Sequence, residues 1–307
     1  MSIFGFILVM IPLSLIGLFV FSVILTPSAK SKSRNYPAPQ SHKQESQSTP
    51  QTIVYAAPKG EVWTDFRRML EQPHLLVAGC QGSGKSVTLN GLIDTILYRL
   101  PFDRDRGAQM ILIDPKCVEF SDYEHLPHTL AYAEGFNPSA WTSAMKKAID
   151  IMESRKAYMK SKRIKTYDKG DLYVFIDEWA TVFRSGKKEA YDLMMRLVSE
   201  GRAEKVHVVM ATQVPTTKII PSEVRENFDA RLCLRTVNTV QSRVIMGEDG
   251  CETLPRPADA GRAEGFYCHG GKIEKIVIPY VTQSELDRDV NYWHDQMRQN
   301  GIDPLVA

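Results

Sequence analysis

The residues best suited to chemistry form one short segment, Gly79–Ser86, with the sequence GCQGSGKS. It fits the pattern G-x-x-x-x-G-K-[ST], in which glycines let successive backbone N–H groups face a polyphosphate. Lys85 would place a cation near the β- and γ-phosphates, and the Ser86 hydroxyl could bind Mg²⁺. A helical pattern follows from Val87, and the positive end of that helix would also favour an anion. The alternative is a glycine-rich turn that binds no ligand.

A pair of adjacent carboxylates completes the interpretation of an ATP site with Mg²⁺. Asp177 and Glu178 end the apolar run Leu172–Ile176. Asp177 would share the Mg²⁺ with Ser86, and Glu178 would orient or deprotonate an attacking water. Glu178 and Lys85 are therefore the candidate catalytic residues, unless the carboxylates only cap a following helix. The expected ATP-binding residues are Gly79, Cys80, Gln81, Gly82, Ser83, Gly84, Lys85, Ser86 and Val87.

A polar end of another apolar run supplies a candidate sensor of the γ-phosphate. Val206–Ala211 is followed by Thr212 and Gln213. If this run forms a strand beside the one that carries the glycine-rich segment, the Gln213 side chain would lie near the phosphates. A simple turn at the end of the strand is the alternative.

Short apolar runs alternate with longer amphipathic stretches from residue 53 onward. The runs have the length and composition of buried parallel strands: His74–Ala78, Met110–Ile113, Leu172–Ile176 and Val206–Ala211. Helical patterns lie at Ser86–Arg99, Ser139–Ser161, Lys188–Glu200 and Ser284–Gln299. A hairpin is expected from Gly265–His269 and Ile273–Tyr280, which flank two glycines. This alternation predicts an α/β domain, with a mostly parallel sheet flanked by helices.

The composition excludes several other classes of protein. Of 307 residues, 43% are hydrophobic and 24% are charged, which is neither a disordered nor a fibrous composition. The net charge of +2 is too small to indicate nucleic-acid binding by itself. The five cysteines form no CxxC pair, so we expect reduced thiols without a zinc site. His125 and His128 flank Pro127, and we interpret them as structural residues.

The first residues differ from the rest of the chain. Ile3–Leu25 contains no charged residue and, as a helix of about 34 Å, would cross a bilayer. A cleaved signal peptide is the alternative, but no Lys or Arg precedes the run. Lys30, Lys32 and Arg34 follow it, which predicts a cytoplasmic C-terminal side. The expected organisation is an anchor at 1–26, a Ser-, Gln- and Pro-rich flexible linker at 27–52 and an ATPase domain at 53–307.

Several of these segments together resemble one protein family. They are His74–Ser86 (HLLVAGCQGSGKS), Ile113–Lys116 (IDPK), Asp177-Glu178, Gly201–Ala203, Ala211–Gln213, Arg231 and Gln241–Arg243. In this order, over about residues 55 to 290, they resemble the motor domain of the FtsK/SpoIIIE DNA translocases. The resemblance implies a RecA-like P-loop NTPase that forms a hexameric ring and pumps double-stranded DNA. It also implies an arginine that reaches the ATP of a neighbouring subunit, for which Arg202 and Arg231 are candidates.

The chain departs from the family pattern at several points. Val214 stands where the family usually has arginine, and Arg256–Gly265 differs from the usual glycine-rich run. Family members that segregate chromosomes have several membrane spans and a C-terminal winged-helix module that reads DNA sequences. Only a short segment follows Tyr280 here, so sequence-directed loading on DNA is not expected.

The resulting hypothesis is a DNA translocase attached to the inner face of a bacterial cytoplasmic membrane by one span, with its N-terminus outside. Plasmid, conjugative-element or phage-related DNA transfer fits the short chain, together with other DNA-transfer proteins. The alternatives are a protein-secretion ATPase, a chromosome-partitioning translocase and an adaptor without ATPase activity. Intact Lys85, Ser86, Asp177 and Glu178 argue against the adaptor.

Overall fold

The computed structural model describes residues 66–99 and 107–301. The expected anchor (1–26), the linker (27–52) and the start of the ATPase domain lie outside these residues. Within the described ranges, the chain forms no helix that is both long and apolar enough to cross a bilayer.

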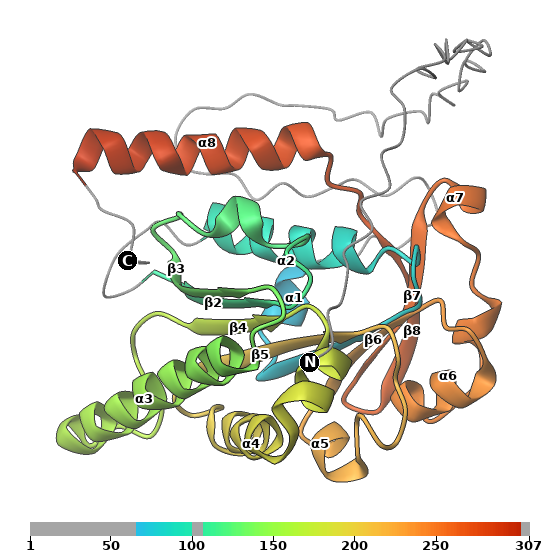
Figure 1. Cartoon of the computed structure of the whole chain (residues 1–307), viewed down its shortest axis with the longest axis horizontal. Helices are drawn as coiled ribbons and strands as arrows, with labels where there is room; N and C mark the ends of the chain where they lie inside the picture. Colours follow the sequence, from blue (N-terminus) through green and yellow to red (C-terminus); the bar gives the residue numbers. More distant parts are fainter. Residues whose placement is uncertain (1–65, 100–106, 302–307) are drawn as a thin grey trace, which may run out of the picture. The chain divides into compact units, whose positions relative to one another are not determined.

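A single mixed sheet runs through the described residues (Figure 1). Its strands are β1 (His74–Ala78), β2 (Gln109–Asp114), β3 (Thr129–Glu134), β4 (Leu172–Ile176), β5 (Val206–Thr212), β6 (Ala230–Leu234), β7 (Ala263–His269) and β8 (Lys272–Ile278). They lie in the order β3-β2-β4-β5-β1-β6-β7-β8. All neighbours from β3 to β6 are parallel, whereas β7 and β8 join as an antiparallel hairpin.

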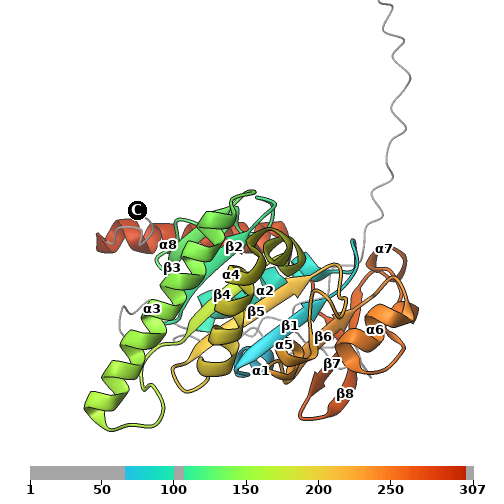
Figure 2. The same ribbon diagram turned by 60° about the horizontal axis from the view of Figure 1, so that its bottom comes forward.

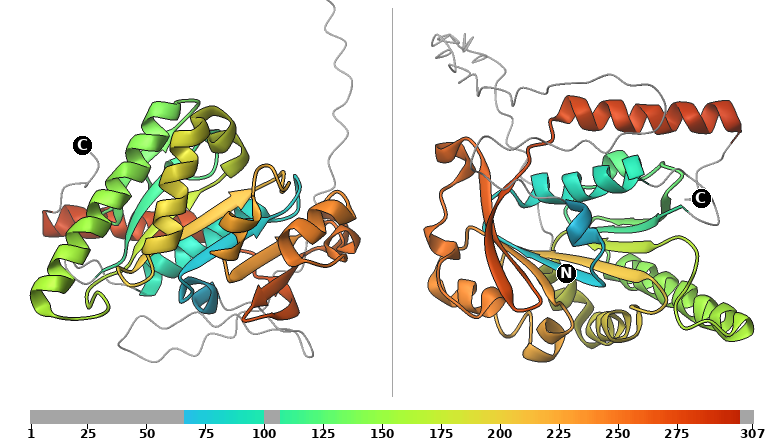
Figure 3. Two further views of the ribbon diagram at one scale, coloured as in Figure 1. Left: turned by 90° about the horizontal axis from the view of Figure 1, so that it is seen from below. Right: turned by 180° about the vertical axis from the view of Figure 1, so that it is seen from behind.

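Helices cover both faces of the sheet. They are α1 (Phe66–Leu70), α2 (Lys85–Arg99), α3 (Pro138–Lys162), α4 (Trp179–Glu200), α5 (Ser222–Glu226), α6 (Thr239–Met246), α7 (Pro257–Ala260) and α8 (Gln283–Asn300), with 3₁₀ turns η1 (Ser121–Tyr123) and η2 (Cys251–Thr253). Helices α3 and α4 lie side by side on one face (Figure 2), and α8 runs along α2 on the other (Figure 3).

Two apolar cores follow from the alternation of side chains along each strand. Leu75 and Val77 of β1 enter the core beneath α1, α2 and α8, whereas Leu76 and Ala78 enter the core beneath α3 and α4. The central parallel strands are buried on both faces, which explains why their sequences are continuous apolar runs. The strands whose carboxyl ends carry the site are therefore held by packing on both faces of the sheet.

Local sequence signals explain where the long outer helices begin. Asn137 caps α3 by accepting a hydrogen bond from the Ala140 N–H, and Pro138 follows at the first helical position. Thr282 and Glu285 form a reciprocal capping box at the start of α8. These caps fix the entry of each helix onto its face of the sheet.

The predicted α/β fold is confirmed, and the sequence patterns located most of its elements. Two of the predicted strands, His74–Ala78 and Leu172–Ile176, match β1 and β4 at both ends. Two strands were missed. β3 lies at the edge of the sheet and is half-exposed, so its sequence lacks a continuous apolar run. β6 contains Arg231, which breaks the apolar pattern.

Helix α4 begins earlier than its amphipathic pattern predicts. The pattern gave Lys188–Glu200, whereas the helix starts at Trp179 and is kinked at Lys187, whose φ is 50° and ψ −132°. The first half carries few of the charged residues that mark an amphipathic helix, and Trp179 is fully buried. The missed half is the part that begins directly after Asp177 and Glu178.

A buried pair of acids links α2 to α8. Asp94 and Asp289 are only 6% and 5% exposed, and their side chains share a hydrogen bond. Burial, and then this bond and the charge of Asp289, raise the pKa of Asp94 to about 8. Asp94 is therefore protonated at neutral pH and can donate to Asp289.

We expect this pair to make stability depend on pH. The folded chain keeps a proton on Asp94 that the unfolded chain releases near pH 3.8, so the stabilisation falls as the pH rises towards 8. Asp94→Asn keeps a hydrogen-bond donor but has no titrating proton. It should therefore reduce the slope of the free energy of unfolding against pH by up to about 1.4 kcal/mol per pH unit. Urea unfolding of the whole chain between pH 5 and 8 measures it. The exposed Asp287→Asn on α8 is the control, and an unchanged slope in Asp94→Asn would contradict the assignment.

Candidate functional site

The site lies at the carboxyl ends of the parallel strands. Strands β2, β4, β5 and β1 are consecutive neighbours, so the residues that follow them meet at one edge. The glycine-rich segment follows β1, Asp177 and Glu178 follow β4, and Gln213 follows β5. The structure thus brings together three segments that the sequence analysis had singled out separately.

The glycine-rich segment forms a tight loop that leads into α2. The Gly79 N–H donates to the Thr212 carbonyl at 3.2 Å, and the Cys80 N–H donates to the Arg235 carbonyl at 2.8 Å. Gly84 has a φ of 99°, and a Cβ there would lie 2.6 Å from the Ala263 Cβ. A side chain at this position would be both strained and in collision, so the loop requires glycine.

Lys85 joins the loop to the end of β4 through a buried ion pair. Its Nζ lies 2.5 Å from Asp177 Oδ1, and it also donates to the Asp177 carbonyl at 3.3 Å. The side chains are only 5% and 1% exposed. Buried charges of this kind are stable only when paired, so the two residues hold each other in position.

Glu178 is held by donors from the end of β5 and from the loop that follows β2. Its Oε1 accepts from the Thr212 hydroxyl at 2.9 Å and the Gln213 N–H at 3.1 Å, and its Oε2 lies 3.3 Å from Lys116 Nζ. Although Glu178 occupies the N-cap position of α4, its side chain makes no capping bond. The alternative interpretation, in which the Glu178 carboxylate only caps the following helix, therefore does not hold.

Asp114 organises the loop that follows β2. Its carboxylate accepts from the backbone N–H groups of Lys116, Val118, Glu119 and Phe120, over distances of 2.8 to 3.1 Å. Asp114 is fully buried, and these bonds satisfy its charge. The loop directs Lys116 to Glu178 and Glu119 to the glycine-rich segment.

Glu119 is a site residue that the sequence analysis missed. Its Oε1 accepts a hydrogen bond from the Ser86 hydroxyl at 2.5 Å. Burial, and also the charges of Asp177 and Asp114, raise the pKa of Glu119. No local pattern marked Glu119, because it lies in the loop beyond β2 and its partner Ser86 is 33 positions away in the sequence.

The residues at this edge fit ATP and Mg²⁺. Serine hydroxyl and carboxylate oxygens are the hard ligands that Mg²⁺ prefers, and Ser86 and Asp177 supply both. The Ser83 hydroxyl is buried in the loop without a hydrogen-bond partner, as expected of a group that awaits a phosphate oxygen. The ATP contacts assigned to Gly79–Val87, and the sensor role of half-buried Gln213, stay predictions.

The two candidate arginines have different surroundings. Arg231 donates to the carbonyls of Phe228 and Ile245 at 2.8 and 3.0 Å, which engages its guanidinium within the chain. Arg202 is exposed and precedes β5. It therefore lies at the amino ends of the parallel strands, whereas the glycine-rich loop lies at their carboxyl ends. Neither arginine lies at the site of its own chain, and their role towards a neighbouring subunit stays a prediction.

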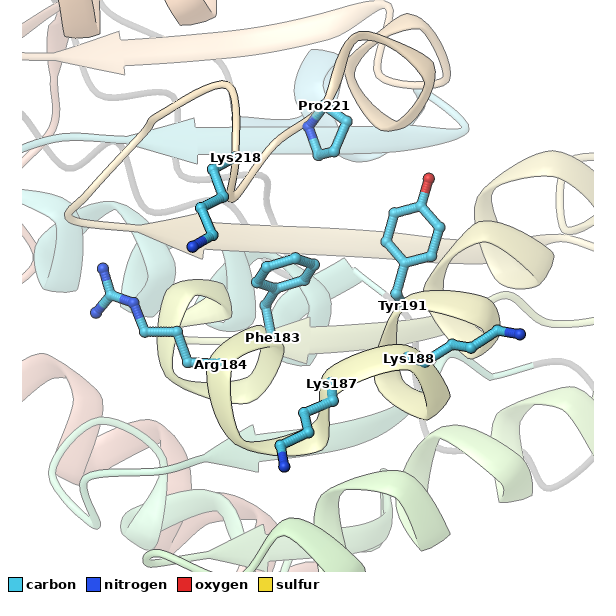
Figure 4. Close-up of a pocket in the computed structure, with 7 residues that line it drawn as sticks. All are labelled: Phe183, Arg184, Lys187, Lys188, Tyr191, Lys218 and Pro221. Carbon is cyan, nitrogen blue, oxygen red and sulfur yellow. The ribbon is translucent and has the colours of Figure 1, made fainter.

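A shallow, cationic pocket lies beside α4 (Figure 4). It has a volume of about 510 Å³ and is lined by Phe183, Arg184, Lys187, Lys188, Tyr191, Lys218 and Pro221. The rings of Phe183 and Tyr191 meet edge-on at 6.3 Å. Among the described residues, no carboxylate pairs with any of the four lining cations. The surface therefore suits an anionic partner.

Comparisons with known proteins identify the family of the chain. The model of the FtsK/SpoIIIE family matches residues 40–270. Proteins named DNA translocase FtsK from Helicobacter pylori (strain J99) and Rhizobium meliloti are 31% and 30% identical, over 75% and 78% of this chain. The match covers only 28% and 31% of those proteins, so the chain spans about a third of their length or less.

Solved structures with the same fold include a conjugation coupling protein and a secretion ATPase. The pCW3 conjugation coupling protein TcpA, in a monomer form with ATPγS, has a TM-score of 0.60 at 19% identity, covering 73% of this chain and 66% of that one. The secretion ATPase EccC of Thermomonospora curvata has a TM-score of 0.60 at 20% identity, covering 72% and 28%. At such identities the likeness concerns the fold alone. The family match and the geometry of the site together show that this chain belongs to the FtsK/SpoIIIE family.

Proposed function

We propose that this chain hydrolyses ATP and uses the energy to move double-stranded DNA. The observation that carries the proposal is the buried constellation of Lys85, Asp177 and Glu178 at the edge of the sheet, in a chain of the FtsK/SpoIIIE family. Each residue has a definite contact that suits its role in phosphoryl transfer.

Lys85 and Ser86 would bind the phosphates and the metal. Lys85 would turn in part from Asp177 to the β- and γ-phosphates, and Asp177 and Ser86 would hold Mg²⁺. When bound, Mg²⁺ neutralises charge that develops on the phosphates during transfer. The ion pair therefore keeps the cation at the place where the nucleotide needs it.

Glu178 would orient the attacking water. Its contacts with Thr212, the Gln213 N–H and Lys116 fix the direction of the carboxylate. The same contacts connect Glu178 to the loop that follows β5, which also carries Lys218 of the cationic pocket. A conformational change at Glu178 can therefore be transmitted to the cationic pocket through the loop that follows β5.

Two observations support DNA as the substrate, and the similarity to secretion ATPases does not favour a protein instead. The relatives with the highest sequence similarity reported above are named DNA translocases. The pocket beside α4 exposes four cations that no described carboxylate neutralises, and phosphate backbones are bound by such groups. Similarity to secretion ATPases is confined to the fold, so it does not favour a protein substrate.

The assembly and location belong to the same proposal. A hexameric ring would let an arginine of one subunit reach the ATP of the next. Arg202 is the better candidate because it is exposed, whereas Arg231 is already bound to two carbonyls. The apolar segment Ile3–Leu25 would anchor the ring to the inner face of a bacterial membrane, for DNA transfer by a plasmid, conjugative element or phage.

Lys85→Ala should abolish ATP hydrolysis. The substitution removes the cation of the phosphate loop that pairs with Asp177, and we expect a loss of at least about 100-fold in kcat. Phosphate release by the purified chain measures it. Exposed Lys160→Ala on α3 is the control for a lost charge, and normal turnover in Lys85→Ala would remove the assignment of the site.

Glu178→Gln should separate binding from hydrolysis. The amide keeps the size of the side chain but is a poor base, so hydrolysis should fall by about 10² to 10⁴-fold while ATP still binds. Equilibrium binding of a fluorescent ATP analogue and single-turnover hydrolysis measure the two steps. Loss of binding in this variant would show instead that Glu178 has a structural role.

Long duplex DNA should stimulate hydrolysis. We expect greater stimulation by long than by short duplex at equal nucleotide concentration, since a moving motor leaves short DNA sooner. The rate should fall steeply with salt because the contacts are to phosphates. Stronger stimulation by single-stranded DNA would indicate that the substrate is single-stranded rather than duplex DNA. If the chain assembles and no DNA changes its rate, a protein substrate becomes the better hypothesis.

A further inference from the structure

We infer that Glu119 is a positioning residue for Mg²⁺, which fixes the Ser86 hydroxyl so that its oxygen faces the metal. This inference rests on the proposed ATPase function. Ser86 has one proton and two lone pairs, so a serine that binds a metal must direct its proton elsewhere. Glu119 Oε1, 2.5 Å from Ser86 Oγ, is the acceptor that the structure provides.

The position of Glu119 is fixed by the loop around it. Its backbone N–H donates to Asp114 Oδ2 at 2.8 Å, and the next residue, Phe120, donates to the same oxygen at 3.1 Å. The Phe120 ring is fully buried and lies edge-on to Phe175 of β4 at 6.1 Å. The carboxylate is thus held at Ser86 by the same core that carries Asp177.

The local charge also favours a cation at this point. The Glu119 and Asp177 carboxylates both contact the start of α2, at Ser86 and Lys85, and Lys85 is the one cation paired with either of them in the described structure. Grouped carboxylates of this kind are stabilised by a bound divalent cation. A carboxylate just beyond a metal ligand orients that ligand, and its removal typically weakens metal affinity 10–100-fold.

A competing role is a latch that holds Ser86 only while no nucleotide is bound. A latch would oppose binding of Mg²⁺ and ATP, whereas a positioning residue would promote it. Removal of the Glu119 side chain therefore has opposite effects in the two cases. Glu119→Ala keeps the backbone bond to Asp114, so the loop should retain its conformation.

The test is binding of a fluorescent ATP analogue to the whole chain as Mg²⁺ is titrated, with EDTA as the starting point. For Glu119→Ala we expect the half-saturating Mg²⁺ concentration to rise at least about tenfold. Binding in EDTA should not weaken. Glu119→Gln, whose amide oxygen can still accept the Ser86 proton, should show a smaller rise. Because Glu119 acts through Ser86, adding Glu119→Ala to Ser86→Ala should cause little further loss.

The control is Glu124→Gln, a half-exposed acid nearby that pairs with His125. An unchanged Mg²⁺ requirement in Glu119→Ala, tighter binding of Mg²⁺ and ATP, or additive losses with Ser86→Ala would each overturn the inference. If the wild-type chain binds the nucleotide normally, these outcomes do not contradict the assignment of the ATP site itself. Failure of the wild-type chain to bind nucleotide under all conditions would instead overturn the proposed function and this inference with it.

Discussion

The buried ion pair between Lys85 and Asp177 is the interaction on which the site depends. It joins the first residue of α2 to the end of β4, two strands away from β1 in the sheet. Such a pair persists only if both charges stay buried and aligned, which requires that the helices on both faces hold the strands in register. The two apolar cores supply that constraint. The parallel sheet therefore determines where the chemistry takes place.

A second buried carboxylate, Asp114, arranges the remaining parts of the site. By binding four backbone N–H groups it bends the chain after β2 so that Lys116 meets Glu178 and Glu119 meets Ser86. The family motif Asp114-Pro115-Lys116 thus acquires a physical explanation. One residue shapes the loop, and the loop places a cation against Glu178 and an acid against Ser86.

Local patterns in the sequence predicted much of this arrangement. The glycine-rich segment and the Asp177-Glu178 pair follow strands whose apolar runs are continuous, because those strands are buried on both faces. The edge strand β3 and the Arg231-containing β6 lack that signal. Glu119 was missed for a different reason: its importance comes from a contact with Ser86, 33 positions away, which no local pattern records.

The central claim is that ATP hydrolysis at this edge of the sheet drives movement along duplex DNA. Displacement of a labelled third strand from a triplex, placed at one end of a long duplex, tests this directly. The account predicts displacement that requires hydrolysable ATP and begins later as the distance to the triplex increases. Displacement that is independent of ATP or of distance, or none despite steady hydrolysis, would contradict it.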